Sequence, residues 1–123
     1  MPESYITSHP RFVTVLKYLQ SHVTGDCNVL EVGGEAASFC DFLPACNNWL
    51  TIDKFGKPTY RIDIEEAGLR LPIESSSIDI IVCTQVLEHL LNAKSFLDEI
   101  TRIVKPRGFL VVSVPNLVGL KSR

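Results

Sequence analysis

The acidic and glycine residues that could bind a ligand lie at the ends of short apolar runs. Glu31 and the pair Gly33-Gly34 close one run, and Asp53 closes the next, 22 positions after Glu31. Glycine lets a ligand approach the backbone closely, and an acid one strand later can accept hydrogen bonds from two ribose hydroxyls. A tight turn explains the glycines about equally well, and a helix cap or a surface position is the alternative for Asp53. Taken with the glycines, the spacing favours the ribose role for Asp53.

Polar residues follow the remaining apolar runs as well. A carboxylate at Asp63 could accept a hydrogen bond from an adenine amino group while Ile64 packs on the ring, although Asp63 alone is better explained as a turn residue. Thr84 and Gln85 follow the fourth run, and Asn116 follows the fifth. Of these residues, Asp63 and Ile64 would, with Asp53, suit the recognition of a nucleoside by hydrogen bonds and apolar contact.

Two apolar signatures alternate along the chain and define the elements that must position these residues. Apolar residues recur at helical spacing in some segments and form near-continuous β-branched runs in others, and Pro106 with Gly108 is expected to end the last helix. Alternating strands and helices indicate an α/β fold with a doubly wound, mainly parallel sheet, whose ligands bind beyond the carboxyl ends of the strands. We expect helices over 10–22, 38–43 and about 96–104, and strands over 28–32, 49–52, 59–64, 78–84 and 109–114.

The bulk composition describes a single globular domain, residues 1–123. Hydrophobic residues make up 46% of the chain and the net charge is -2, without the basic cluster typical of nucleic-acid binding. A small molecule is therefore the favoured partner, and nucleic acid is disfavoured. Because no apolar run approaches the roughly 20 residues of a membrane span and no signal pattern is visible, we expect no membrane association and a cytoplasmic location.

The four cysteines are Cys27, Cys40, Cys46 and Cys83, and none of them forms a C-x-x-C pair. Their spacing matches no common zinc site. We therefore expect all four to be reduced and mostly buried.

As a set, the polar strand ends and apolar runs resemble the class I S-adenosylmethionine-dependent methyltransferases, nearest to the broad small-molecule branch that includes quinone-modifying and polysaccharide-modifying enzymes. The resemblance covers almost the whole chain from Val29 to Asn116. The similar segments are VLEVGG at 29–34, TID at 51–53, RID at 61–63, RLPIESSSIDIIVCTQVLEHL at 70–90 and FLDEITRIVKPRGFLVVSVPN at 96–116.

This resemblance implies that S-adenosylmethionine is the cofactor, bound by residues at four strand ends. Glu31 would orient the methionine amino group through water, and Asp53 would bind the ribose. The remaining cofactor-binding residues would be Gly33 and Gly34 along the methionine part, Asp63 and Ile64 at the adenine, and Thr84, whose backbone carbonyl would lie beside the amino group.

The resemblance also implies an acceptor pocket, faced by Gln85, Glu88 and His89 and rimmed by Asn116. His89 would act as a general base if the acceptor must lose a proton. Some relatives, including small-RNA 2′-O-methyltransferases, bind a divalent metal through a Glu-x-x-Glu-His pattern and a later histidine. Gln85 replaces the first acid here and no histidine follows His89, so we expect no metal.

The chain departs from the family's first motif, acid-x-Gly-x-Gly-x-Gly, at two positions. Ala37 is a mild change, but Glu35 brings a negative charge to the place where the cofactor carboxylate normally approaches the backbone. Like charges a few Å apart repel by on the order of 1 kcal/mol or more when partly shielded from water. This departure favours a second interpretation, a non-catalytic binding or scaffold domain. A nicotinamide oxidoreductase is disfavoured, because its G-x-G-x-x-G signature would need glycine at Glu35 and Ser38.

The chain also ends sooner than the family pattern. Relatives continue past the fifth strand with a lid and two further strands, so we expect a sheet that lacks the last two strands. The fifth strand would then present an exposed apolar edge, which proteins usually cover or pair. We expect a second copy, giving a homodimer, or another protein to cover this edge; the alternative is that the chain is a shortened form of a longer one.

Overall fold

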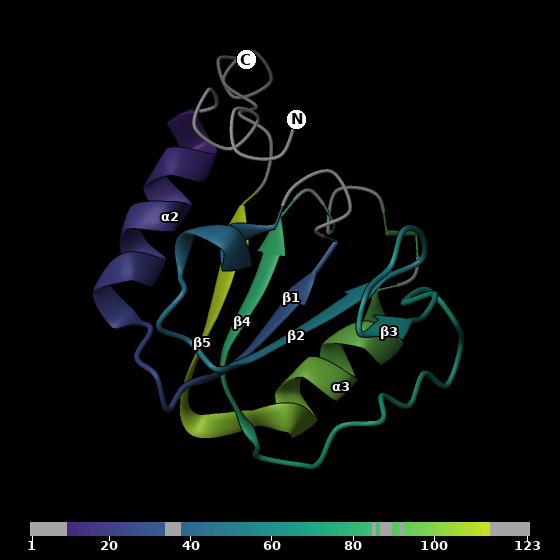
Figure 1. Cartoon of the computed structure of the whole chain (residues 1–123). Helices are drawn as coiled ribbons and strands as arrows, with labels where there is room; N and C mark the ends of the chain where they lie inside the picture. The colour runs from purple at the N-terminus through teal and green to yellow at the C-terminus, as the bar shows by residue number, and fades with distance from the viewer. Residues whose placement is uncertain (1–9, 34–37, 85, 87–89, 92, 114–123) are drawn as a thin grey trace, which may run out of the picture.

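The computed structural model describes residues 10–33, 38–84, 86, 90–91 and 93–113. Its strands form one all-parallel sheet in the order β3-β2-β1-β4-β5, so the strand order reverses between β1 and β4 (Figure 1). The predicted α/β class and parallel sheet are confirmed. The strands are β1 (Asn28–Val32), β2 (Asn48–Asp53), β3 (Tyr60–Arg61), β4 (Ile78–Thr84) and β5 (Val104–Ser113), and the helices are α2 (Pro10–His22), the 3-10 helix η1 (Phe39–Phe42) and α3 (Lys94–Ile103).

Helix α2 covers one face of the sheet and has the bounds that the sequence predicts. Pro10 suits its first turn because the missing N–H would be unpaired there anyway. The apolar residues of α2 recur at helical spacing and are buried against β1, β4 and η1. This α2-side core consists of Phe12, Val15, Leu16, Leu19, Val29, Phe39, Leu43, Ile80 and Val82.

Helix α3 packs on the opposite face, so the sheet is covered on both sides as a doubly wound fold requires (Figure 1). Phe96, Ile100 and Ile103 are buried against the sheet. They belong to the α3-side core, which comprises Leu30, Val32, Ile52, Leu69, Leu71, Ile78, Ile81, Cys83, Val86, Phe96, Ile100 and Ile103.

The junction between α3 and β5 differs from the prediction that Pro106 and Gly108 end the helix. Helix α3 ends at Ile103, and Val104 already has extended backbone angles and pairs with Ile78 of β4. The next paired position on β4 joins Ile80 to Phe109, so residues 105–108 form a bulge. A side chain at Gly108 would lie 2.9 Å from the Asp79 carbonyl oxygen, so glycine permits this close approach.

Strand β3 is also shorter than the predicted 59–64. Before it, the Thr51 and Thr59 backbone amides each donate to the hydroxyl of the other residue, at 3.0 and 2.7 Å, in place of a regular ladder. After it, Asp63 starts a turn whose closing bond runs from the Glu66 amide to the Asp63 carbonyl, 3.2 Å. Side-chain hydrogen bonds and a turn therefore limit the strand to Tyr60 and Arg61.

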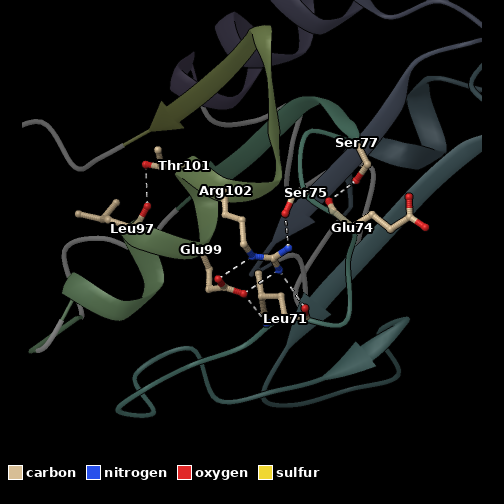
Figure 2. Close-up of polar contacts among 8 residues, drawn as sticks. All are labelled: Leu71, Glu74, Ser75, Ser77, Leu97, Glu99, Thr101 and Arg102. Atoms are coloured by element: carbon tan, nitrogen blue, oxygen red, sulfur yellow. Dashed lines mark hydrogen bonds and ion pairs between the residues drawn. The ribbon is translucent and has the colours of Figure 1, made fainter.

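A partly buried ion pair links α3 to the segment before β4 (Figure 2). The Arg102 guanidinium donates to both carboxylate oxygens of Glu99, each at 2.8 Å, and to the Leu71 carbonyl at 3.1 Å. Glu99 in turn accepts the Leu71 amide at 2.6 Å. The Arg102 carbonyl then accepts the Ser76 amide at 2.9 Å, so backbone and side chain fix the same segment.

The structure also addresses the predictions made for the cysteines and for membrane-spanning helices. All four cysteines are free thiols, as expected, but only Cys83 is fully buried; Cys27, Cys40 and Cys46 are half-buried, so the expectation that most are buried is wrong. Within the described residues, no helix is both long and apolar enough to cross a membrane.

Candidate functional site

The carboxyl ends of four strands meet at one edge of the sheet. The Gly33 amide, just after β1, donates to the Ile52 carbonyl of β2 at 2.9 Å. The Ile62 amide, just after β3, donates to the Asp53 carbonyl at 3.0 Å. On the other side of β1, a side chain at Gly33 would lie 3.4 Å from the carbonyl oxygen of Thr84, which ends β4. This edge is where open parallel sheets bind ligands, next to the reversal of strand order.

Asp53 and Asp63 lie on neighbouring strand ends at this edge. Asp53 is half-buried, and its Oδ1 atom accepts the Phe55 amide at 3.1 Å. Asp63 is exposed, and its Oδ1 atom accepts the Glu65 amide at 3.0 Å. Each carboxylate thus closes a local turn, the alternative that the sequence left open for Asp63. The burial of Asp53 makes it the stronger candidate for ligand recognition.

A hollow of about 180 Å³ lies beside Asp53. A second hollow, of about 400 Å³, lies where β1, β2 and β4 begin and includes Asn28, Asn48 and Ile78. We assign the candidate site to the smaller hollow, because ligands of such sheets bind beyond the carboxyl ends of the strands and not at the amino ends. Its lining residues are Ser38, Thr51, Asp53, Phe55, Gly56, Lys57 and Pro58.

Glu31 is 0% exposed and accepts hydrogen bonds from three protein groups. Its Oε1 atom accepts the Ser38 hydroxyl at 2.6 Å and the Trp49 indole N–H at 3.0 Å, and its Oε2 atom accepts the Phe39 amide at 3.3 Å. Burial raises the pKa of this carboxyl, against the opposing effect of the three donors. Sequence reasoning missed Ser38 and Trp49 as partners, although the serine directly before η1 is a typical helix-capping residue.

Three other residues predicted to bind the cofactor lie within the described part of the chain. Thr84 is buried at the end of β4, and Ile64 is half-buried against the α3-side core. Gly33 has a positive φ of 82° and lies against the side chain of Val86, a residue that the sequence analysis did not single out. Glycine at position 33 is therefore required by backbone geometry and by packing, apart from any ligand.

The other predicted site residues, Gly34, Gln85, Glu88, His89 and Asn116, lie outside the described residues. Their expected roles at the cofactor and the acceptor stay predictions. Among the residues that the structure does describe, no group of three or more metal-ligating side chains is close enough to hold a metal ion.

A comparison with known protein families identifies the family of this chain. A family model described as a methyltransferase domain matches residues 40–112, more than half of the 123 residues. The chain belongs to this family. The match includes β2, β3, β4, α3 and nearly all of β5, so it covers Asp53, Asp63 and Thr84.

Individual relatives of this methyltransferase domain are similar over a shorter segment. A probable S-adenosylmethionine-dependent methyltransferase of Mycolicibacterium smegmatis is 39% identical over 59 residues, which cover 47% of this chain and 23% of that protein. A protein of the same description from Mycobacterium tuberculosis is 37% identical over 59 residues, 47% of this chain and 22% of its own length. The match thus spans less than a quarter of these relatives. A search of solved structures gave no significant match.

Family membership implies S-adenosylmethionine as the cofactor, and the described residues fit its adenosine half. The half-buried Asp53 carboxylate is an acceptor suited to ribose hydroxyls, and it borders a hollow that also contains the Phe55 side chain. Residues 34–37, which would approach the methionine half, lie outside the described residues.

Replacing Gly33 by alanine is expected to destabilise the methyltransferase domain by about 2 kcal/mol, because the new methyl group meets Val86 in a left-handed backbone conformation. Gly68 is a matched control: its φ is +68°, but a side chain there meets nothing within 4 Å. Gly68→Ala should therefore cost only about 1 kcal/mol, from backbone strain alone. Urea unfolding followed by circular dichroism measures both variants, and equal losses would show that the Val86 contact does not matter.

Proposed function

We propose that this domain transfers a methyl group from S-adenosylmethionine to a small-molecule or glycan acceptor in the cytoplasm. The observation that carries the proposal is the half-buried Asp53, which lies beside the hollow at the carboxyl end of β2 in a chain of the methyltransferase-domain family. The names of the mycobacterial relatives, which describe probable S-adenosylmethionine-dependent methyltransferases, support the same cofactor.

In this proposal the chain's own residues bind and orient the reactants. When bound, the cofactor supplies an electrophilic methyl group on a sulfonium, so the protein mainly has to position donor and acceptor. Asp53 would accept hydrogen bonds from the ribose, and Asp63 with Ile64 would contact the adenine. Buried Glu31 would act by holding Ser38, which lines the hollow, in place.

A non-catalytic methyltransferase-like domain is the second candidate, and Glu35 is the observation that favours it. A carboxylate near the methionine carboxylate would weaken cofactor binding by charge repulsion. Calorimetric titration with S-adenosylmethionine and with S-adenosylhomocysteine separates the two candidates. Heat of binding supports the enzyme, whereas no heat at millimolar ligand would leave only the binding or scaffold domain.

Asp53→Ala is expected to weaken S-adenosylhomocysteine binding by about tenfold to a hundredfold, the cost of losing one or two hydrogen bonds to a charged acceptor. Calorimetry or the fluorescence change of Trp49 gives the dissociation constant. Asp26→Ala is the matched control, since it removes an exposed acid before the amino end of β1 and should leave the affinity unchanged. An unchanged affinity in Asp53→Ala would remove Asp53 from the site.

A further inference from the structure

Glu31 does not itself reach the hollow beside Asp53. Its side chain is 0% exposed, and it is not one of the described residues that line the hollow. Its Oε1 atom accepts the Ser38 hydroxyl at 2.6 Å and the Trp49 indole N–H at 3.0 Å. A ligand in the hollow would therefore meet a group that Glu31 holds in place, and not the Glu31 carboxylate itself.

Ser38 is the residue that connects Glu31 to the hollow. It is half-buried, and it lines the hollow together with Asp53. The distance of 2.6 Å from the Ser38 hydroxyl to Glu31 Oε1 is typical of a hydroxyl that donates to a carboxylate. The single proton of the Ser38 hydroxyl is thus directed at Glu31.

The hydrogen bonds of the Ser38 hydroxyl leave room for one more. A serine hydroxyl has one proton to donate and two lone pairs that accept. The proton is donated to Glu31, and one lone pair accepts the Cys40 amide at 3.1 Å. The described residues supply no other partner for this hydroxyl. Ser38 can therefore accept one hydrogen bond from a ligand, but it has no proton left to donate.

Thr51 carries the other hydroxyl among the described residues that line the hollow, and this hydroxyl is already engaged. Its oxygen accepts the Thr59 amide at 2.7 Å and lies 3.3 Å from the Thr59 hydroxyl oxygen. These bonds connect β2 to the residue directly before β3. Among the described lining residues, Ser38 and Asp53 are therefore the better candidates for accepting hydrogen bonds from a ligand.

The size of the hollow limits which part of a ligand Ser38 would contact. Its volume of about 180 Å³ is smaller than the roughly 300 Å³ at which pockets for whole drug-sized ligands begin. The hollow therefore holds one part of a cofactor. In the proposed function that part is the ribose, because Asp53 lines the same hollow. A ribose has two neighbouring hydroxyls, each of which donates one hydrogen bond.

We propose that Ser38 is a further cofactor-binding residue, whose hydroxyl accepts a hydrogen bond from one ribose hydroxyl while Asp53 accepts the other. Glu31 is then a positioning residue, because it takes the Ser38 proton and so keeps Ser38 an acceptor. Donation to a carboxylate also makes the Ser38 oxygen a stronger acceptor, since hydrogen bonds in a chain polarise one another. This inference rests on the proposed function.

Calorimetric titration of the full chain with adenosine tests the role of Ser38, because adenosine has the ribose but not the methionine part. Ser38→Ala should weaken the binding of adenosine and of S-adenosylhomocysteine by about threefold to tenfold, the effect of one neutral hydrogen bond. Ser38→Thr keeps the hydroxyl and should retain most of the affinity. The matched control is Ser21→Ala, which removes an exposed hydroxyl on α2 and should bind like the parent.

Deoxyadenosines separate a contact with the ligand from a merely structural effect of the substitution. The 2′-deoxy and 3′-deoxy forms each keep one ribose hydroxyl. The loss caused by Ser38→Ala should disappear with one of them and persist with the other, because only one hydroxyl contacts Ser38. The same loss with both forms, or no loss with adenosine itself, would overturn the proposal.

The proposed function and the role of Ser38 fail in different ways. A parent chain that binds neither adenosine nor S-adenosylhomocysteine would overturn both. A parent that binds both ligands, with unchanged affinity in Ser38→Ala, would overturn the role of Ser38 alone. Circular dichroism verifies that the variants are folded. If alanine prevents folding, Ser38→Gly replaces it in the same titrations, because glycine is tolerated better than alanine before a helix.

Discussion

Glu31→Ala should lower the free energy of unfolding by about 3–5 kcal/mol, because it leaves one buried and two half-buried donors without an acceptor. The donors are the Ser38 hydroxyl, the Phe39 amide and the Trp49 indole N–H. Urea unfolding followed by circular dichroism measures the loss. Glu31→Gln is the control, since it keeps one acceptor oxygen and should cost clearly less than alanine. A loss below about 1 kcal/mol for alanine would show that these hydrogen bonds contribute little.

The same position predicts a pH dependence with a definite sign. Burial raises the pKa of Glu31 above its ordinary value of 4.5, so the folded state binds this proton more tightly than the unfolded chain does. Its contribution to stability is therefore complete below pH 4.5 and is lost as the pH rises through the folded pKa. The stability advantage of the parent over Glu31→Gln should shrink as the pH rises above 4.5. An advantage that grows over this range would contradict the assignment.

Glu99→Ala should destabilise the domain by about 3 kcal/mol, because it leaves the Arg102 guanidinium without its counter-ion and the Leu71 amide without its acceptor. Thermal or urea unfolding measures this loss. Asp98→Asn is the matched control on the same helix: it breaks an exposed ion pair with Lys94 and should leave stability unchanged within error. Equal effects of the two variants would show that burial of the Glu99 pair adds nothing.

Acid sensitivity distinguishes this ion pair from a purely steric contact. The hydrogen bonds from Arg102 lower the pKa of Glu99 from 4.5 to about 2. A carboxyl with a depressed folded pKa contributes its stability above the unfolded value and loses it as the pH falls towards the folded value. The advantage of the parent over Glu99→Ala should therefore be constant above pH 4.5 and decline between about 4.5 and 2. A pH-independent difference would indicate that only packing is lost.

The elements that were predicted with their correct bounds are those with strong local signals. Helix α2 and strands β1 and β4 combine a clear apolar period with flanking polar or glycine residues, which mark their ends in the sequence itself. The α3 to β5 junction was wrong because Pro106 and Gly108 read as helix-stop signals. Their actual place is a β-bulge, set by contact with Asp79 on another strand. Such a contact is not visible in local sequence.

In the candidate site, too, local sequence predicted the positions of residues but not their contacts with distant residues. The sequence placed Asp53, Asp63 and Thr84 at strand ends, because each follows an apolar run, and the parallel sheet brings these ends to one edge. The surroundings of Glu31 were not predictable, because its bond to Trp49 joins residues 18 positions apart on different strands. The partner of Gly33 was missed for the same reason, since Val86 lies just beyond the end of the neighbouring strand β4.

The tie between Arg102 and the segment before β4 has a consequence for how the domain opens. The Ser76 and Ser77 amides donate to the Arg102 and Ile103 carbonyls, so the start of β4 and the end of α3 cannot separate without breaking these bonds. We therefore expect both to unfold together, along with β4 and β5, which share a long ladder of backbone pairs. Thr84 lies at the other end of β4, at the carboxyl edge of the sheet. Unfolding of the start of β4 and the end of α3 would therefore also displace Thr84 and disrupt the candidate site.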